Sequence, residues 1–218
     1  MNPWMTEADE AALAQFEAIV LSQKPAETPW EPVTPFDFES RKAIEGQHAR
    51  LILEVFHPRW LIDVGCGPDG HLLRLLHEEQ PTWAHHFCGF DVQPRRTDRM
   101  EIWQGDIAGQ MNEVGQFDLV VCREVLEHLT LRKIRTAVAN LCKLSSRFVY
   151  CTTRFAVNPT SLLAVGRSDE LDPTHISMTN QAWLRHLFVL EGFRRRADLE
   201  SRLDWKNLGR VLVYERVA

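Results

Sequence analysis

The sequence has no long hydrophobic run and no excess of basic charge. No apolar stretch approaches the roughly 20 residues that a membrane-spanning helix needs. The acidic N-terminal segment also lacks the basic and then apolar pattern of a secretory signal. The net charge of -5 disfavours binding to nucleic acid through a broad basic face. We therefore expect a globular, cytoplasmic protein, whose 218 residues suffice for one domain of ordinary size.

The cysteines show no pattern of pairing. There are five, an odd number, and no two stand in a C-x-x-C arrangement. Most lie in apolar runs, where a cysteine behaves as a small buried hydrophobic residue. We expect neither a disulfide nor a zinc site from Cys66, Cys88, Cys122, Cys142 and Cys151.

The sequence does contain a regular alternation of short apolar runs and helical segments. Helices are predicted over residues 5–22, 38–56, 71–79, 131–144 and 181–191. Strands are predicted at 60–65, 86–91, 101–104, 117–122 and 147–153, followed by two last runs at 193–199 and 209–214. This alternation is typical of an α/β protein with a doubly wound, mostly parallel sheet, which here has seven strands.

The two ends of the chain depart from that alternation. The last two runs are joined by a connection with no room for a crossover helix, so we expect an antiparallel C-terminal hairpin. Four prolines exclude a helix between residues 24 and 38. We expect residues 1–57 to form an N-terminal helical extension or lid, and residues 58–218 to form the main domain. Trp30, Phe36 and Phe38 would then cover the active site or pack the first helix against the core.

A glycine-rich segment lies where the first predicted strand meets a helix. It runs from Asp63 to Gly70, with Gly65 and Gly67 on either side of Cys66. Glycine is needed there because the backbone turns tightly and approaches a ligand with no side chain between them. The amides at the helix N-terminus then face that ligand. The spacing G-x-G-x-x-G suits several nucleotides equally well.

Residues after the next strands narrow the choice of ligand. Asp91, followed by Val92, ends the second strand, where a carboxylate can accept both hydroxyls of a ribose. Asp106 and Ile107 follow the third strand, where they can accept an adenine amino group and pack against the ring. The fourth strand ends at Cys122, beside the glycine-rich segment. Together these segments predict a site for an adenosine-containing cofactor.

In their order and spacing, these four segments resemble motifs I to IV of the class I, Rossmann-like S-adenosylmethionine-dependent methyltransferases. The resemblance covers residues 60–214. It implies that the protein is a transferase that uses S-adenosyl-L-methionine as its cofactor and methylates a small-molecule acceptor. It also implies that Asp63 supports the first loop and the amino group, that Asp91 binds the ribose, and that Asp106 binds the adenine.

The resemblance also implies the remaining cofactor contacts. Gly65 and Gly67 would pass beneath the methionine part, and a carbonyl near Cys122 or Arg123 would face the methionine ammonium group. One departure is Asp69, which stands where the family has a third glycine, with Gly70 one residue later. Either the loop has one extra residue, or Asp69 replaces a glycine that is not required. The full set of implied cofactor-binding residues is Asp63, Gly65, Cys66, Gly67, Asp91, Val92, Asp106, Ile107, Cys122 and Arg123.

Acidic and histidine side chains follow the fourth strand. Glu124, Glu127 and His128 have helical spacing, which could place two carboxylates and an imidazole together. This pattern resembles a metal-dependent RNA 3′-terminal 2′-O-methyltransferase family, with His175 as the nearest further histidine. It also occurs in small-molecule methyltransferases similar to the quinone-biosynthesis group, where the histidine lines the pocket. We expect the second arrangement, without a metal, and take His128 and His175 as candidate bases for the transfer.

Other functions fit the motifs less well. A nicotinamide oxidoreductase has the same glycine spacing but leaves Asp106 and the C-terminal hairpin without a role. A non-catalytic domain that keeps the cofactor pocket is also compatible with these residues. The helix over 38–56 could bring Arg41 or His48 to the methionine carboxylate, although we assign neither. The sequence leaves open the acceptor, the atom that is methylated and the oligomeric state.

Overall fold

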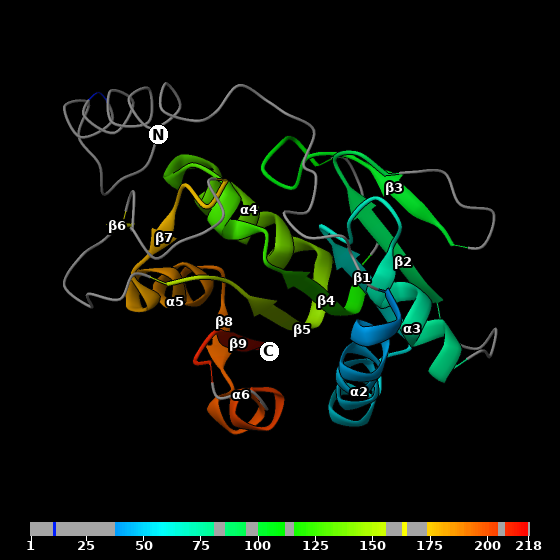
Figure 1. Ribbon diagram of the computed structural model, residues 1–218. Helices are drawn as coiled ribbons and strands as arrows, with labels where there is room; N and C mark the ends of the chain where they lie inside the picture. Colours follow the sequence, from blue (N-terminus) through cyan, green and yellow to red (C-terminus); the bar gives the residue numbers. More distant parts are fainter. Residues whose placement is uncertain are drawn as a thin grey trace.

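A seven-stranded mixed sheet forms the centre of the protein (Figure 1). The structure is a computed structural model that describes residues 11, 38–80, 86–94, 100–111, 116–155, 163–164, 174–204 and 208–217. The strands of the sheet are β1 (Trp60–Val64), β2 (His86–Asp91), β3 (Ile102–Gln104), β4 (Phe117–Arg123), β5 (Ser145–Thr152), β8 (Phe193–Arg195) and β9 (Val211–Arg216). Their order across the sheet is β3-β2-β1-β4-β5-β9-β8.

The direction of the strands confirms the predicted fold class. β1 to β5 run parallel to one another, and β9 is antiparallel to both β5 and β8. The protein is therefore a doubly wound α/β protein with an antiparallel C-terminal pair. A separate small pair, β6 (Leu163–Ala164) with β7 (Met178–Thr179), has no counterpart in the sequence prediction.

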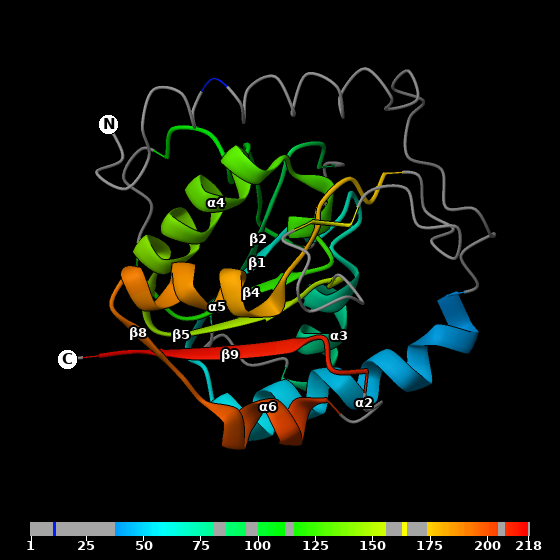
Figure 2. The same cartoon turned by 90° about the vertical axis from the view of Figure 1, so that its left-hand side faces the viewer.

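Helices cover both faces of the sheet, as Figure 2 shows. The helical segments are α2 (Phe38–Phe56), α3 (His71–Glu79), the 3-10 turn η1 (Leu126–His128), α4 (Leu131–Leu144), α5 (Gln181–Leu190) and α6 (Ala197–Leu203). α4 and α5 lie on one face of the sheet, and α2, α3 and α6 lie on the other. The sheet is thus enclosed between two helical layers, as the alternation of elements predicts.

Each face of the sheet has its own hydrophobic cluster. Val120 of β4 packs in the first cluster with Ile134 of α4, whereas Leu119 and Val121 pack in the second with Ile52 of α2. This alternation along β4 follows from the two-residue period of a strand. All five cysteines are buried and free, as the sequence predicts.

The C-terminal strand pair differs from its prediction. β8 ends at Arg195, and residues 197–203 form helix α6 instead of continuing the strand. The strand predicted over 193–199 is therefore too long, and the connection contains the short helix α6, although β8 pairs antiparallel with β9 as predicted. Leu199 and Leu203 of α6 are buried in the second cluster, and Glu200 accepts two hydrogen bonds from Arg195 at 2.6 and 2.8 Å. A helix permits both the burial and this pairing.

Several predictions concern residues outside the described part of the chain. These are the helix over 5–22, of which only Ala11 is described and is helical, and the proline-rich stretch with Trp30 and Phe36. The side chains of Phe38 and Arg41 are likewise outside that part. The division of the chain at residue 57 stays a prediction. Helix α2, which precedes that boundary, packs on the main domain through buried side chains in the second cluster: Ala49, Ile52, Leu53 and Phe56. Among the described residues, we find no helix with the length and hydrophobicity to cross a membrane.

Candidate active site

The carboxyl ends of the parallel strands bring most of the predicted site residues to one edge of the sheet. Asp63 lies in β1, Asp91 ends β2, and Arg123 ends β4. Because these strands are parallel, the glycine-rich loop after β1 and Asp106 after β3 lie at the same edge. The chain crosses from β1 to β2 on one side and reaches β4 on the other, so β1 marks the switch point of the sheet. Ligands of doubly wound sheets bind at this position.

The loop after β1 is shaped by two glycines with left-handed backbone conformations. Gly65 has φ 71° and Gly67 has φ 74°, values that favour glycine. The Gly65 amide donates a hydrogen bond to the Phe90 carbonyl at 2.7 Å, and the Cys66 side chain packs in the second cluster. A Cβ on Gly65 would stand 2.2 Å from Cγ2 of Val125, whereas a Cβ on Gly67 would meet no atom within 4 Å. Gly65 therefore packs closely against the chain after β4, while Gly67 faces open space within the described structure.

Asp91 supports this loop and keeps further acceptor capacity. Its Oδ2 accepts a hydrogen bond from the Gly67 amide at 2.9 Å, and its Oδ1 accepts one from the Gln93 amide at 2.9 Å. An ionised carboxylate has about four lone-pair positions, so about two remain for a ligand. Two adjacent hydroxyls of a ribose fit that capacity. The next side chain, Val92, is 56% exposed, and its contact with a cofactor stays a prediction.

The segment after β3 is held by helix α4. Asp106 accepts a hydrogen bond from the amide two residues further on at 2.8 Å and forms an ion pair with Lys133 at 3.3 Å. The amide group of Asn140 donates to the carbonyls of Ile107 at 2.6 Å and Gly109 at 3.0 Å. Ile107 is buried in the first cluster. These contacts fix the segment, and the predicted contacts of Asp106 and Ile107 with adenine stay predictions.

Asp63 is buried beneath the loop with only 2% of its surface exposed. Burial raises the pKa of its carboxyl group to about 7. The Arg123 guanidinium opposes this rise in pKa, and the Asp91 and Glu45 carboxylates add to it. Near neutral pH, this acid is therefore close to the point at which it exchanges a proton, and a cationic group nearby would favour its ionised form.

A line of polar contacts joins the end of β4 to helix α2. Arg123 Nη1 lies 3.3 Å from His48 Nδ1, and Arg123 Nη2 lies 3.8 Å from Glu45 Oε2. The same Glu45 oxygen is 3.3 Å from Nε2 of His71 in α3. His48 Nε2 in turn lies 2.6 Å from the buried hydroxyl of Tyr150 in β5. Helix α2 is thus fastened by charged and polar groups beside the loop that follows β1.

The chain turns sharply where β4 ends. Glu124 has a left-handed backbone with φ 53°, which is uncommon for a residue other than glycine, and its amide donates to the Thr152 carbonyl at 2.8 Å. Its carboxylate lies 3.3 Å from Nε of Arg154. The predicted helical spacing from Glu124 to His128 is therefore wrong, because only the short turn η1 follows this strained residue. Val125, between Glu124 and η1, packs on Gly65.

Glu127 is a buried carboxylic acid within η1, with no exposed surface. Its Oε2 accepts a hydrogen bond from the Thr153 hydroxyl at 2.8 Å, and its carbonyl accepts one from the Ser177 amide at 3.0 Å. Burial raises the pKa of Glu127 to about 8, and the nearby Glu124 carboxylate adds to the rise. The protonated form is thus favoured at neutral pH. Within the described ranges, no group of three or more His, Cys, Asp or Glu side chains is arranged to hold a metal ion.

The two predicted bases lie side by side. The His128 and His175 rings are in edge contact, with their centroids 4.8 Å apart. Nδ1 of His128 lies 2.9 Å from the Thr174 hydroxyl and 3.2 Å from the Thr174 carbonyl. When this nitrogen donates to the carbonyl, Nε2 carries the lone pair that can accept a proton. The structure therefore joins these two histidines, although they are far apart in the sequence.

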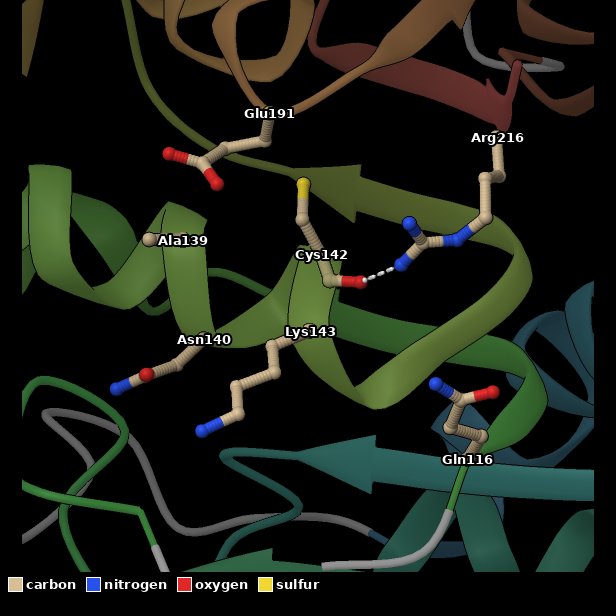
Figure 3. Close-up of a pocket in the computed structure, with 7 residues that line it drawn as sticks. All are labelled: Gln116, Ala139, Asn140, Cys142, Lys143, Glu191 and Arg216. Carbon is tan, nitrogen blue, oxygen red and sulfur yellow. Dashed lines mark hydrogen bonds between the residues drawn. The ribbon is translucent and has the colours of Figure 1, made fainter. Parts of the chain in front are cut away.

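A cavity of about 410 Å³ lies at the opposite edge of the sheet, near the amino ends of β4 and β5 (Figure 3). It is lined by Gln116, Ala139, Asn140, Cys142, Lys143, Glu191 and Arg216. Its Arg216 donates to the carbonyls of Cys142 and Ser145 at 2.6 and 2.8 Å, which satisfies the last turn of α4. This cation therefore has a structural role, and the cavity contains none of the predicted site residues.

Some residues of the site had no clear signal in the sequence. Thr174 and Asn140 act through hydrogen bonds to residues distant in the chain, so neither belongs to a local motif. Glu45 and the side chain of Arg123 meet only because α2 lies across the end of β4. The one available signal was the helical phase of α2, which places His48 and the buried Ile52 on the same side.

Comparison with known proteins identifies the family. The model of a family described as "Methyltransferase domain" matches residues 39–196. A search of curated proteins finds no match. Among solved structures, DesVI of Streptomyces venezuelae is 17% identical, with a TM-score of 0.57 over 98% of this chain and 100% of that one. The sugar N-methyltransferase KedS8 of Streptoalloteichus is 15% identical, with a TM-score of 0.59 over 89% and 98%.

A third structure with this fold comes from Synechocystis. Magnesium protoporphyrin IX methyltransferase of Synechocystis, solved with bound S-adenosylmethionine, is 14% identical and has a TM-score of 0.52. The match covers 99% of this chain and 100% of that one. At such identities, the likeness concerns the fold, while the family match spans most of the chain. The chain therefore belongs to the methyltransferase-domain family, and it has the fold of the class I S-adenosylmethionine-dependent methyltransferases.

Proposed function

We propose that this protein transfers the methyl group of S-adenosylmethionine to an oxygen or nitrogen atom of a small molecule. The observation that carries the proposal is the pairing of the Gly67 amide with Asp91 at the edge of the sheet where the His128 and His175 rings also meet. Two similar structures support the small-molecule acceptor, because their names describe a sugar N-methyltransferase and a magnesium protoporphyrin IX methyltransferase.

The residues at the edge of the sheet fit the proposed cofactor. Gly67 leaves space where a side chain would stand, and Asp91 retains acceptor positions for two ribose hydroxyls. The buried Asp63 offers a carboxylate for an ammonium group. When bound, S-adenosylmethionine supplies a methyl group that its positive sulfur has already activated, so the protein mainly has to position the acceptor.

We assign proton removal to His128. The contact of Nδ1 with Thr174 orients the ring and directs Nε2 away from that residue. Nε2 would take the proton from a hydroxyl or ammonium group of the acceptor during the transfer. His175, in edge contact with this ring, would line the acceptor site. The role of His128 requires no metal.

The competing functions find less support. A nicotinamide oxidoreductase disagrees with the family match. A metal-dependent RNA methyltransferase needs a metal site, and the described residues contain no suitable group of three ligands. The proposal therefore retains a small-molecule acceptor, while the cytoplasmic location and the disfavoured binding to nucleic acid stay predictions from composition.

The test is an activity screen with a matched histidine variant. The purified protein is incubated with S-adenosylmethionine and panels of amino sugars and hydroxylated aromatic compounds, and the release of S-adenosylhomocysteine is measured. For an active acceptor, His128→Ala should lower kcat by about 10²- to 10⁴-fold while the affinity for S-adenosylhomocysteine stays the same. An equal loss of affinity and turnover would assign His128 to the folding of the site. His77→Ala, in the last turn of α3, is the control and should keep full turnover.

A further inference from the structure

We infer that the guanidinium group of Arg123, held between Glu45 and His48 of helix α2, binds the carboxylate at the amino-acid end of the cofactor. This inference rests on the proposed function, since it concerns how the same cofactor site recognises its ligand. It assigns to the β4 side chain, and to α2, a part in cofactor selection.

The placement of Arg123 supports this role. It is the last residue of β4, at the carboxyl edge next to the loop that follows β1. Along β4, Leu119 and Val121 face the second cluster, so the two-residue period places Arg123 on that same face, beneath α2. The contacts of its guanidinium with His48 and Glu45 agree with this direction. Arg123 is therefore a cation at the rim of the cofactor loop.

The bonding of Arg123 is incomplete in the described structure. A guanidinium has five N–H donors. Here Nη1 reaches His48 Nδ1 at 3.3 Å, and Nη2 is 3.8 Å from Glu45 Oε2, which is beyond hydrogen-bond distance. The Nε atom is buried and has no hydrogen-bond partner among the described residues. An oxyanion that accepts from this group would satisfy a buried donor that now lacks an acceptor.

Other arginines of the chain show how different this is. Arg195 donates to Glu200 at 2.6 and 2.8 Å, and Arg196 donates to Asp198 at 2.7 and 2.9 Å. Each of those two guanidinium groups donates two N–H hydrogen bonds to one carboxylate. Arg123 has no such partner in the described part of the protein, although Glu45 lies nearby. The fork of Arg123 thus remains suited to a carboxylate that comes from a ligand.

The charged residues around the loop complement the ammonium and carboxylate groups of an amino acid. Asp63 provides a buried acid beneath the loop, and Arg123 provides a cation whose charge is felt at Asp63. An ammonium group placed near the acid and a carboxylate placed near the cation would neutralise both. Glu45 Oε2 lies 3.8 Å from this guanidinium and 3.3 Å from Nε2 of His71, so its charge is shared between two groups. The pair would therefore select ligands that carry the whole amino-acid end.

The test compares two ligands that differ only in this end. S-adenosylhomocysteine has the amino-acid group, and 5′-methylthioadenosine lacks it. Calorimetry should show that Arg123→Gln lowers the affinity for S-adenosylhomocysteine by about 10- to 100-fold and leaves the affinity for 5′-methylthioadenosine unchanged. Arg123→Lys, which keeps the charge but loses the fork, should give an intermediate loss. As a control, Arg50→Gln removes an exposed cation of helix α2, which pairs with Glu79, and should leave both affinities unchanged.

The outcomes separate the inference from the proposed function. Equal weakening of the two ligands by Arg123→Gln would overturn the inference, because the arginine would then only support the fold of the loop. Unchanged affinity for S-adenosylhomocysteine would overturn it as well. If the unmodified protein binds neither ligand, the proposed function fails together with the inference that rests on it. A thermal unfolding curve of each variant confirms that the compared proteins are folded.

Discussion

Replacement of Gly65 by alanine tests how the loop after β1 is built. The added Cβ would stand 2.2 Å from Cγ2 of Val125, and the backbone would keep a left-handed φ of 71°. A left-handed residue with a Cβ costs roughly 1–2 kcal/mol. Overpacking of a methyl group costs roughly another 1–3 kcal/mol. We therefore expect Gly65→Ala to lower the free energy of unfolding by about 2–5 kcal/mol.

Gly67 provides a matched control for this prediction. It has a similar φ of 74°, but its added Cβ would meet no atom within 4 Å. Gly67→Ala should therefore cost only the backbone part, about 1–2 kcal/mol, while the methyl group obstructs the cofactor and lowers its affinity. Urea unfolding followed by circular dichroism gives the stabilities, and calorimetry with S-adenosylhomocysteine gives the affinities.

A second substitution separates the two costs at Gly65. Val125→Ala removes the Cγ2 atom that the new methyl group would meet. In a double-mutant cycle, the two changes should therefore be less destabilising together than their sum, by about 1–3 kcal/mol. Additive effects of the two changes, or equal destabilisation by Gly65→Ala and Gly67→Ala, would show that Gly65 is not packed closely against Val125.

Two further predictions concern the acids of the cofactor site. Asp91→Ala should weaken S-adenosylhomocysteine by about 1.5–3 kcal/mol, because charge-assisted hydrogen bonds are lost; an unchanged Kd in calorimetry would remove Asp91 from the ribose site. Since burial raises the pKa of Asp63 to about 7, the group is neutral below that pH and a carboxylate above it. A ligand with an ammonium group should therefore bind more tightly at about pH 8 than at about pH 6 and release protons on binding near neutrality. Calorimetry in buffers of different ionisation enthalpy measures that release, which Asp63→Asn should abolish; release that persists in this variant would contradict the assignment.

The parallel part of the sheet could be predicted from the sequence because its strands are buried on both faces. The runs that begin at Trp60 and Phe117 are nearly continuous in apolar residues, and each is followed by a helix or a turn with a clear start. The C-terminal pair was harder to predict. Phe193 and Leu199 are both apolar, so the sequence pattern does not show where the strand ends. The pairing of Glu200 with Arg195 and the burial of α6 decide that end. The packing of α6 against α2, which is distant in the chain, leaves no local pattern in the sequence.

The candidate site could be predicted at positions where the backbone conformation or the end of a strand requires a particular residue type. Gly65 and Gly67 need left-handed conformations, and Asp91 ends a strand that must face them. The left-handed turn at Glu124 was not predictable, since the side chain gives no sign of it and the spacing suggests a helix. The contact of Arg123 with α2 depends on where the helix lies across the sheet, which is a property of tertiary packing.

Calorimetric titration of the unmodified protein with S-adenosylmethionine, S-adenosylhomocysteine and NAD, with and without EDTA, shows which cofactor the site at the edge of the sheet binds. We expect micromolar binding of the two sulfur-containing ligands, no binding of NAD, and no effect of EDTA. Binding of NAD in place of the sulfur-containing ligands would contradict the assignment as an S-adenosylmethionine-dependent methyltransferase.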